Sequence, residues 1–212
     1  MPASSVDVAR LPRHALRTGT VAYRIYRRLD GRRVRSPWYF SCAGSSSSGR
    51  FDLPAPRGTC YFASTAVGAW LEVFGGADVV AASDVRRRSL ATAERTGAPL
   101  TLADLASRRS AVAGVTLDLT ATDDYAAPQA VALAASDRGR HGIRALLRRD
   151  PSGSSHGLAL FGTGGAPSRQ FGWRVSKTPL WRDATVLREV AALGVRVLDI
   201  PHDLPITPVG PR

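Results

Sequence analysis

The most constraining feature of the sequence is a short apolar run joined directly to a helical pattern, TCYFASTAVGAWLEVFGG at residues 59–76. The first six residues have the character of a buried strand. Apolar residues then recur at i, i+3, i+4 and i+7, as on an amphipathic helix: Val67, Trp70, Leu71 and Phe74. Ser64 or Thr65 is a suitable N-cap, and two glycines end the pattern. The stretch therefore predicts a strand that leads at once into a helix.

Other short strands and helices follow in irregular order along the chain. We expect strands at 20–29, 156–162 and 195–200, a strand within 79–94, a helix beyond Pro128 in the stretch 123–136, a helix at 183–193, and a short helix from about Asp104. This order lacks the regular strand–helix alternation of a parallel α/β fold. It predicts an α+β fold, with short mixed strands and surrounding helices.

The length of 212 residues, 44% of them hydrophobic, suits one compact domain. We expect a loosely held lead-in at 1–18, the domain itself at 19–200, and a proline-rich tail at 201–212. No run of eighteen apolar residues occurs, and the N-terminal segment lacks the apolar core of a signal peptide. These features predict a cytoplasmic protein without a membrane segment.

The formal net charge of +12 raises nucleic acid as a partner. However, Lys177 is the single lysine, and the chain is rich in alanine. Arginine in place of lysine together with abundant alanine is what a GC-rich coding sequence produces without selection for a partner. No zinc finger, RNP motif or helix-turn-helix accompanies the scattered arginines. Direct nucleic-acid binding is therefore a minor hypothesis, and an acidic protein partner uses the same charge equally well.

The cysteines and histidines indicate neither a disulfide framework nor a metal site. Cys42 and Cys60 lack metal-binding spacing, so we expect two free thiols that are buried or half-buried. No pair of the four histidines has a metal-ligand spacing, and no bound metal is expected. The segment GTGGAP at 162–167 lacks the lysine of a phosphate loop and predicts a turn.

Three chemically useful residues, Arg50, Tyr61 and Glu72, follow one another at steps of eleven. Arg50 ends a small polar loop, so its planar fork could hold a phosphate beside free backbone amides. Glu72 lies away from the apolar stripe of its helix, next to Gly68 and Ala69, whose small size would leave room for a ligand. The alternatives stay open at this point: a surface arginine, a core tyrosine and a solvated glutamate.

Four fragments resemble the RES domain family: AYRIYRR, GRFD, CYFAS followed by AWLEVFG, and HGIRALLRRDPSGSSHGLALFG. In order, they span about residues 20–165. The resemblance implies a fold similar to that of ADP-ribosyltransferase toxins and an activity that consumes NAD. It also implies a bacterial toxin, paired with an antitoxin of Xre type that carries a helix-turn-helix. It leaves open whether the chain forms a homo-oligomer.

By this resemblance, Arg24 and Arg50 would hold the pyrophosphate of NAD, Tyr61 would pack on the nicotinamide or ribose, and Glu72 would be the catalytic carboxylate. Arg24 taken alone is equally consistent with a solvent-facing strand residue. The resemblance implies cleavage of the nicotinamide–ribose bond by hydrolysis or phosphorolysis, or transfer of ADP-ribose to a protein. It implies no metal.

The chain departs from the family pattern in the run GIRALLRRD at residues 142–150. The position of the family's serine falls on Leu147, which cannot donate a hydrogen bond to a ribose or phosphate. Ser154 and Ser155 follow closely and could replace that serine only if their loop folds back. A catalytically weakened module that still binds NAD is therefore the alternative from a different functional class.

Overall fold

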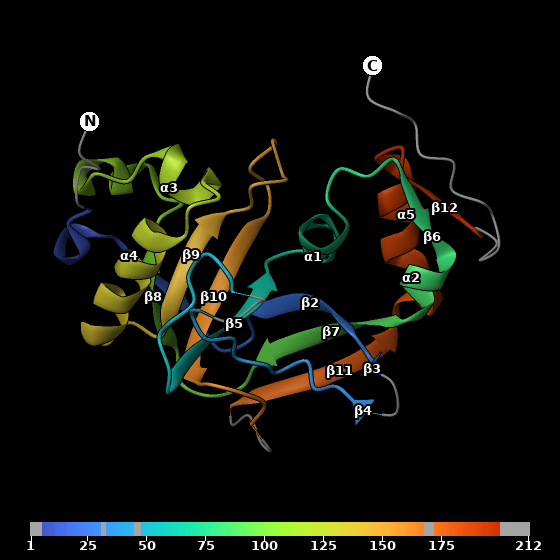
Figure 1. Cartoon of the computed structure of the whole chain (residues 1–212), viewed down its shortest axis with the longest axis horizontal. Helices are drawn as coiled ribbons and strands as arrows, with labels where there is room; N and C mark the ends of the chain where they lie inside the picture. Colours follow the sequence, from blue (N-terminus) through green and yellow to red (C-terminus); the bar gives the residue numbers. More distant parts are fainter. Residues whose placement is uncertain (1–5, 31–32, 45–47, 168–171, 200–212) are drawn as a thin grey trace.

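One curved eight-stranded sheet forms the centre of the computed structural model, which describes residues 6–30, 33–44, 48–167 and 172–199 (Figure 1). The strand order is β1-β8-β9-β10-β5-β2-β7-β11. Neighbouring strands are antiparallel, except that β8 and β9 run parallel. The bounds are β1 Arg13–Leu16, β8 Leu100–Asp104, β9 Gly142–Leu146, β10 His156–Thr163, β5 Arg57–Ala63, β2 Val21–Arg27, β7 Arg88–Arg95 and β11 Trp173–Pro179.

The helices lie in two groups at opposite ends of the sheet (Figure 1). One group lies near β8 and β9 and contains η1 Val8–Arg10, η2 Arg108–Ala113, α3 Leu117–Ala121 and α4 Ala126–Asp137. The other lies near β2 and β7 and contains α1 Ala66–Phe74, α2 Ala82–Arg86, η3 Leu180–Arg182 and α5 Ala184–Ala192. Two small strand pairs complete the fold: β6 Val79–Ala81 with β12 Arg196–Leu198, and β3 Leu29–Asp30 with β4 Arg33–Val34.

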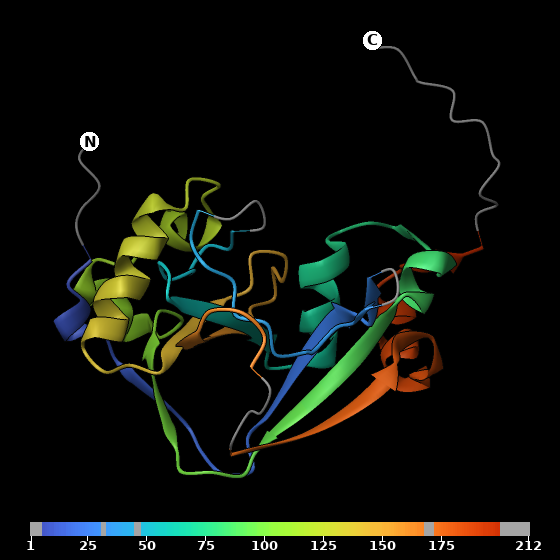
Figure 2. The same ribbon diagram turned by 60° about the horizontal axis from the view of Figure 1, so that its bottom comes forward.

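The sheet is strongly curled, and its two faces carry different cores (Figure 2). Alternation along β5 separates them, because Tyr61 packs with one core while Cys60 and Phe62 pack with the other. The core that contains Cys60 and Phe62 is aromatic. In this core the ring centroids of Trp38 and Phe62 are 4.7 Å apart. The face of the sheet that carries Tyr61 also carries the two groups of helices, and the candidate site lies between these groups.

The predicted strand–helix unit at 59–76 is confirmed. Thr65 is the N-cap of α1, since its hydroxyl accepts a hydrogen bond from the Gly68 amide at 2.9 Å. Gly75 ends the helix with a φ of 67°, a conformation that favours glycine. On the predicted apolar stripe Trp70 is fully buried, and its ring centroid lies 4.3 Å from that of Phe74.

Most of the other predicted elements are also present. The strands at 20–29 and 156–162 correspond to β2 and β10, and the helix at 183–193 corresponds to α5. The helix expected beyond Pro128 is α4, which begins earlier, at Ala126. Asp183 caps α5 by accepting a hydrogen bond from the Val186 amide. The α+β class is confirmed, and the stretch 79–94 contains a short helix, α2, between strands β6 and β7.

The chain before residue 19 differs from the loosely held lead-in that we expected. From residue 6 onward it is packed: β1 pairs with β8, and Val8, Leu11 and Leu16 are buried. The segment is held because these apolar side chains join the two cores on either side of the sheet. The expected tail at 201–212 lies outside the described residues.

The short helix expected from about Asp104 is wrong. Asp104 instead ends strand β8, and a 3₁₀ helix begins only at Arg108. The Asp104 carboxylate accepts hydrogen bonds from the Ala106 amide and from Arg144 at 2.9 Å, which fixes a turn where a helix would have continued. Among the described helices, none is long and apolar enough to cross a membrane.

Candidate functional site

Arg50, Tyr61 and Glu72 line one pocket of about 220 Å³. Arg50 comes from the loop before β5, Tyr61 from β5 itself, and Glu72 from α1. The other lining residues are Gly49, Phe51, Tyr125, Ala145, Leu146, Leu147, Gly157 and Ala159. The structure therefore brings together the three residues that the sequence spaces at steps of eleven.

Arg50 projects from its loop with donors available to a ligand. Its guanidinium lies 5.8 Å from the centroid of the Tyr125 ring, within the range of a cation–π contact. Its Nε is buried and has no hydrogen-bond partner among the described residues. A buried donor of this kind is costly unless it is satisfied, so a bound anion would complete the site.

Asp52, whose carboxylate is fully buried, fixes the conformation of the Arg50 loop. It accepts hydrogen bonds from the Gly49 amide at 2.6 Å, the Ser41 hydroxyl at 2.9 Å and the Tyr61 hydroxyl at 2.7 Å. These bonds tie both sides of Arg50 to the sheet. Asp52 ends the fragment GRFD, but no local pattern in the sequence indicates this role.

Tyr61 supports the loop through its hydroxyl and faces the pocket with its ring. The hydroxyl donates to Asp52 and accepts from the Phe51 amide at 2.9 Å. Burial and the neighbouring Asp52 raise the pKa of Tyr61, so the phenol stays protonated and remains a donor. A Cβ at Gly49 would lie only 2.6 Å from this hydroxyl, which explains why a glycine precedes Arg50.

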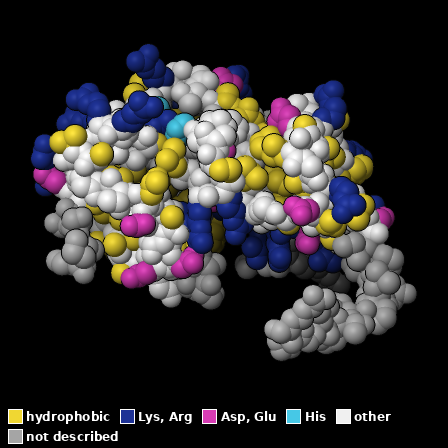
Figure 3. Space-filling model, turned by 90° about the horizontal axis from the view of Figure 1, so that it is seen from above, with side chains coloured by type: hydrophobic (Ala, Val, Ile, Leu, Met, Phe, Trp, Pro, Cys, Tyr) yellow, Lys and Arg dark blue, Asp and Glu magenta, His cyan; other side chains and the backbone are white. Residues whose placement is uncertain are grey.

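Glu72 lies on the exposed side of α1 and faces three arginines. Desolvation raises the pKa of its carboxyl, while the charges of Arg50, Arg149 and Arg148 act in the opposite direction. Arg149 is close to the end of α1, since a Cβ at Gly75 would lie 2.6 Å from its guanidinium. Arg148 forms an ion pair with Asp123. From above, basic side chains gather near the middle of this face (Figure 3).

We expected the small residues beside Glu72 to leave room for a ligand, but at Gly68 the structure uses the small size for close packing. Gly68 is buried, and a Cβ there would lie 2.8 Å from both a methyl group of Leu147 and the Cβ of Ser155. Gly68 therefore lets α1 pack closely against the residues that follow β9 and precede β10, and it leaves no space for a ligand. The Leu147 side chain occupies the space next to Gly68. It also lines the pocket, with 6% of its surface exposed.

Ser154 and Ser155 lie away from this pocket. The Ser155 hydroxyl is 2.7 Å from that of Thr65, and the Ser154 hydroxyl donates to Asp150 at 3.1 Å. The loop does fold back, but onto the N-terminal end of α1, where it contributes to a different cavity. Neither serine takes the place of Leu147.

Arg24 is the one expected site residue that the structure does not bring to the others. It contacts the Cys60 thiol, and its guanidinium lies 6.0 Å from the centroid of the Phe62 ring. Both partners belong to the aromatic core on the opposite face of the sheet from Tyr61. The period of two along a strand explains this placement, because Tyr23, and not Arg24, shares a face with Tyr61 and Ala63.

Cys42 and Cys60 are free thiols, half-buried and buried respectively, as the sequence predicts. Among the described residues, no group of three or more His, Cys, Asp or Glu could hold a metal ion. Sequence reasoning missed Tyr125 and Arg149. They come from segments distant from Arg50, and only the doublet at 148–149 was visible as a charge cluster.

Comparison with known proteins finds the RES domain family over residues 21–183. No curated protein matches the chain. Among solved structures, a chain in the crystal structure of the M. tuberculosis MbcT–MbcA toxin–antitoxin complex has a similar fold, with a TM-score of 0.50 and 19% sequence identity. That match covers 79% of this chain and 85% of the other. Since the family model matches well over half of its length, the chain belongs to the RES domain family.

Proposed function

We propose that this protein is a toxin that consumes NAD by cleaving its nicotinamide–ribose bond. The observation that carries the proposal is the position of Glu72, a carboxylate opposite Arg50 in one pocket and within the field of Arg148 and Arg149. NAD combines a pyrophosphate, which arginines bind, with a glycosidic carbon, which a carboxylate can stabilise as it becomes cationic.

In the proposed reaction the bond between the ribose C1′ and the nicotinamide nitrogen breaks, and its electron pair stays with nicotinamide. The ribose passes through a state that resembles an oxocarbenium ion, which the charge of Glu72 stabilises. Oxygen from water or phosphate, or a nucleophile from a protein, then bonds to C1′ and loses its proton. Arg50 acts at a distance from this bond by holding the pyrophosphate, which orients the ribose.

The MbcT–MbcA complex supports the assignment as a toxin with a protein antitoxin. A shared fold at 19% sequence identity does not identify the antitoxin of this chain. We propose an antitoxin of Xre type, as the family resemblance implies. The high positive charge of +12 suits a partner with an acidic contact surface.

The test is release of nicotinamide from NAD by the purified protein, measured by chromatography. We expect wild-type protein to release nicotinamide, and Glu72→Gln to slow the release at least about 100-fold, since removal of one well-placed stabilising group has an effect of this order. Asp78→Asn is the matched control, because Asp78 is an exposed carboxylate outside the pocket. Analysis of the second product as ADP-ribose, its phosphate ester or a modified protein identifies the acceptor.

A second candidate function is a module that binds NAD without turnover. Leu147 favours it, because an apolar side chain lines the pocket where the family pattern places a serine. NAD binding by wild-type protein without nicotinamide release would support this candidate. Gain of release in Leu147→Ser would then show that the missing hydroxyl limits the reaction.

A further inference from the structure

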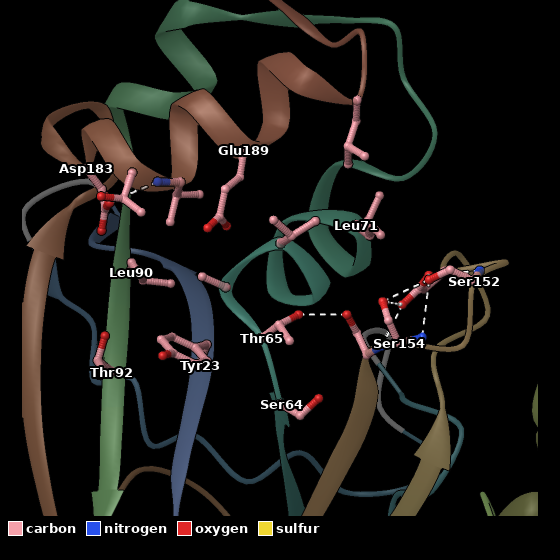
Figure 4. A pocket seen from close by; sticks show the side chains of 17 residues that line it. Tyr23, Ser64, Thr65, Leu71, Leu90, Thr92, Ser152, Ser154, Asp183 and Glu189 are labelled. Carbon is pink, nitrogen blue, oxygen red and sulfur yellow. Dashed lines mark hydrogen bonds between the residues drawn. The ribbon is translucent and has the colours of Figure 1, made fainter.

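A second, larger cavity lies beside α1 (Figure 4) and shares no lining residue with the Arg50–Glu72 pocket. Its volume is about 720 Å³, within the usual range of a small-molecule site. Leu71 lines this cavity, while the next residue, Glu72, lines the other pocket. Its walls are α1, α5, strands β2 and β7, and the loop at 150–155.

The lining of this cavity has the opposite charge character from the rest of the protein. No Lys or Arg is among its described lining residues, although the chain has a net charge of +12. Three carboxylates line it instead: Asp150, Asp183 and Glu189. An anion such as a phosphate would find no cationic partner, so the cavity cannot be a second copy of the Arg50 site.

Two of the three carboxylates already have partners within the protein. Asp150 accepts hydrogen bonds from the Ser155 amide at 2.7 Å and from the hydroxyls of Ser152 and Ser154. Asp183 accepts from the Val186 amide at the start of α5. Glu189 differs, because its carboxylate has no partner among the described residues and points from α5 into the cavity (Figure 4).

Tyr23 and Thr92 lie below Glu189 on the floor of the same cavity (Figure 4). They are directly opposite each other on β2 and β7, and neither hydroxyl has a hydrogen-bond partner in the described part of the chain. Leu71, Leu90 and Val186 add apolar side chains to the lining of the cavity. One free negative charge, two free hydroxyls and apolar walls therefore converge from different elements.

We propose that this cavity binds a small organic cation, an amine or guanidine on a short apolar body. Glu189 is its counter-ion, the apolar walls contact its body, and Tyr23 and Thr92 accept or donate hydrogen bonds at the other end. A guanidinium fits a single carboxylate through two parallel hydrogen bonds, and the exposed position of Glu189 leaves its carboxylate open to such a ligand. The site is independent of the proposed NAD reaction, since it shares none of its lining residues.

The test uses butylguanidine as the probe and butylurea as its neutral, nearly isosteric control. Each is titrated into isotopically labelled full-length protein, and the backbone amide signals are followed by NMR. We expect butylguanidine to shift signals around Tyr23, Thr92 and Glu189, and butylurea to cause no comparable shifts. Glu189→Gln is expected to weaken butylguanidine binding about tenfold or more, as the loss of a hydrogen bond to a charged group implies.

Three variants separate this site from general charge effects. Asp78→Asn, an exposed carboxylate elsewhere, and Glu72→Gln, in the other pocket, should leave butylguanidine binding unchanged. Tyr23→Phe should leave butylguanidine binding close to the wild-type value, because the butyl group of this probe has no hydrogen-bonding atom for the Tyr23 hydroxyl. Equal binding of butylurea, binding that survives Glu189→Gln, or binding that is lost in Glu72→Gln would each overturn the proposal. These outcomes do not depend on whether NAD is cleaved.

Discussion

The Tyr61 hydroxyl donates a hydrogen bond of 2.7 Å to Asp52, a carboxylate with no solvent exposure. Asp52 also accepts from the Gly49 amide, and Tyr61 accepts from the Phe51 amide. The two side chains therefore hold the backbone on both sides of Arg50. This arrangement makes the position of the arginine a property of the sheet, since Tyr61 belongs to β5.

Removal of this hydroxyl should loosen the Arg50 loop. Tyr61→Phe leaves Asp52 buried with one partner fewer, so we expect unfolding free energy to fall by about 1–3 kcal/mol, as for other buried groups left unsatisfied. Because the loop positions Arg50, the KM for NAD should rise more than kcat falls. Urea denaturation and nicotinamide release measure the two effects.

The matched control for this prediction is Tyr39→Phe. Tyr39 is 51% exposed, and its side chain does not line the pocket. It should leave both stability and KM close to the wild-type values. A Tyr61→Phe protein with wild-type KM would mean that the loop does not position a group that binds NAD.

The charges around Glu72 should set the acid limit of activity. Desolvation raises the pKa of Glu72, so the carboxylate is protonated, and activity lost, at a higher pH than for an ordinary glutamate. Arg149 lowers this pKa, so Arg149→Gln should move the acid limb of the kcat/KM profile to still higher pH. Arg109→Gln, at an exposed arginine outside the pocket, should not move it. An acid limb shifted to lower pH in Arg149→Gln would contradict this account of the site.

Close packing at Gly68 should make this position intolerant of any side chain. A Cβ there lies 2.8 Å from Leu147 and Ser155, so Gly68→Ala should destabilise the protein. The free-energy cost of overpacking, about 1–3 kcal/mol, outweighs the stabilisation of about 1 kcal/mol that alanine brings through its higher helix propensity. Adding Leu147→Ala should recover part of the loss, which a double-mutant cycle in urea would measure. Additive effects of the two changes would show that Gly68 and Leu147 are not in contact.

Asp150 should contribute stability that depends on pH. Burial alone would raise its pKa, but hydrogen bonds from Ser152, Ser155 and Ser154 lower it to about 2. In the unfolded chain the value is about 4, so the stabilisation is complete above that pH and is lost as the pH falls toward 2. Asp150→Asn should therefore reduce stability at pH 6 by about 2–3 kcal/mol and much less at pH 2. A loss of the same size at both pH values would show that the charge is not responsible.

Local patterns carried the fold class and the strand–helix unit because their signals are complete within a few residues. The N-cap at Thr65, the apolar stripe around Trp70 and the glycine stop at Gly75 all lie in one short stretch. In contrast, the packing of β1 against β8 joins residues about 90 positions apart, as with Arg13 and Ala103, and no local pattern predicts it.

The site was predictable to the extent that its residues lie near one another in the sequence. Arg50, Tyr61 and Glu72 come from consecutive elements, so their spacing and the family resemblance indicated them together. Only the path of the chain in three dimensions brings Tyr125 to the pocket and the charge of Arg149 close to Glu72. Arg24 was expected in the site but lies on the opposite face of the sheet, next to Cys60. A shift of one position along a strand moves a side chain to the other face.

The most direct test of the central claim is where NAD binds. Glu72→Gln protein, which should bind NAD without rapid cleavage, is titrated with NAD while its backbone amide signals are followed by NMR. The account predicts shifts at Gly49, Arg50, Tyr125 and Gly157, around the 220 Å³ pocket. Shifts confined to Thr185 and Glu189 in the other cavity, or no binding in either place, would contradict it.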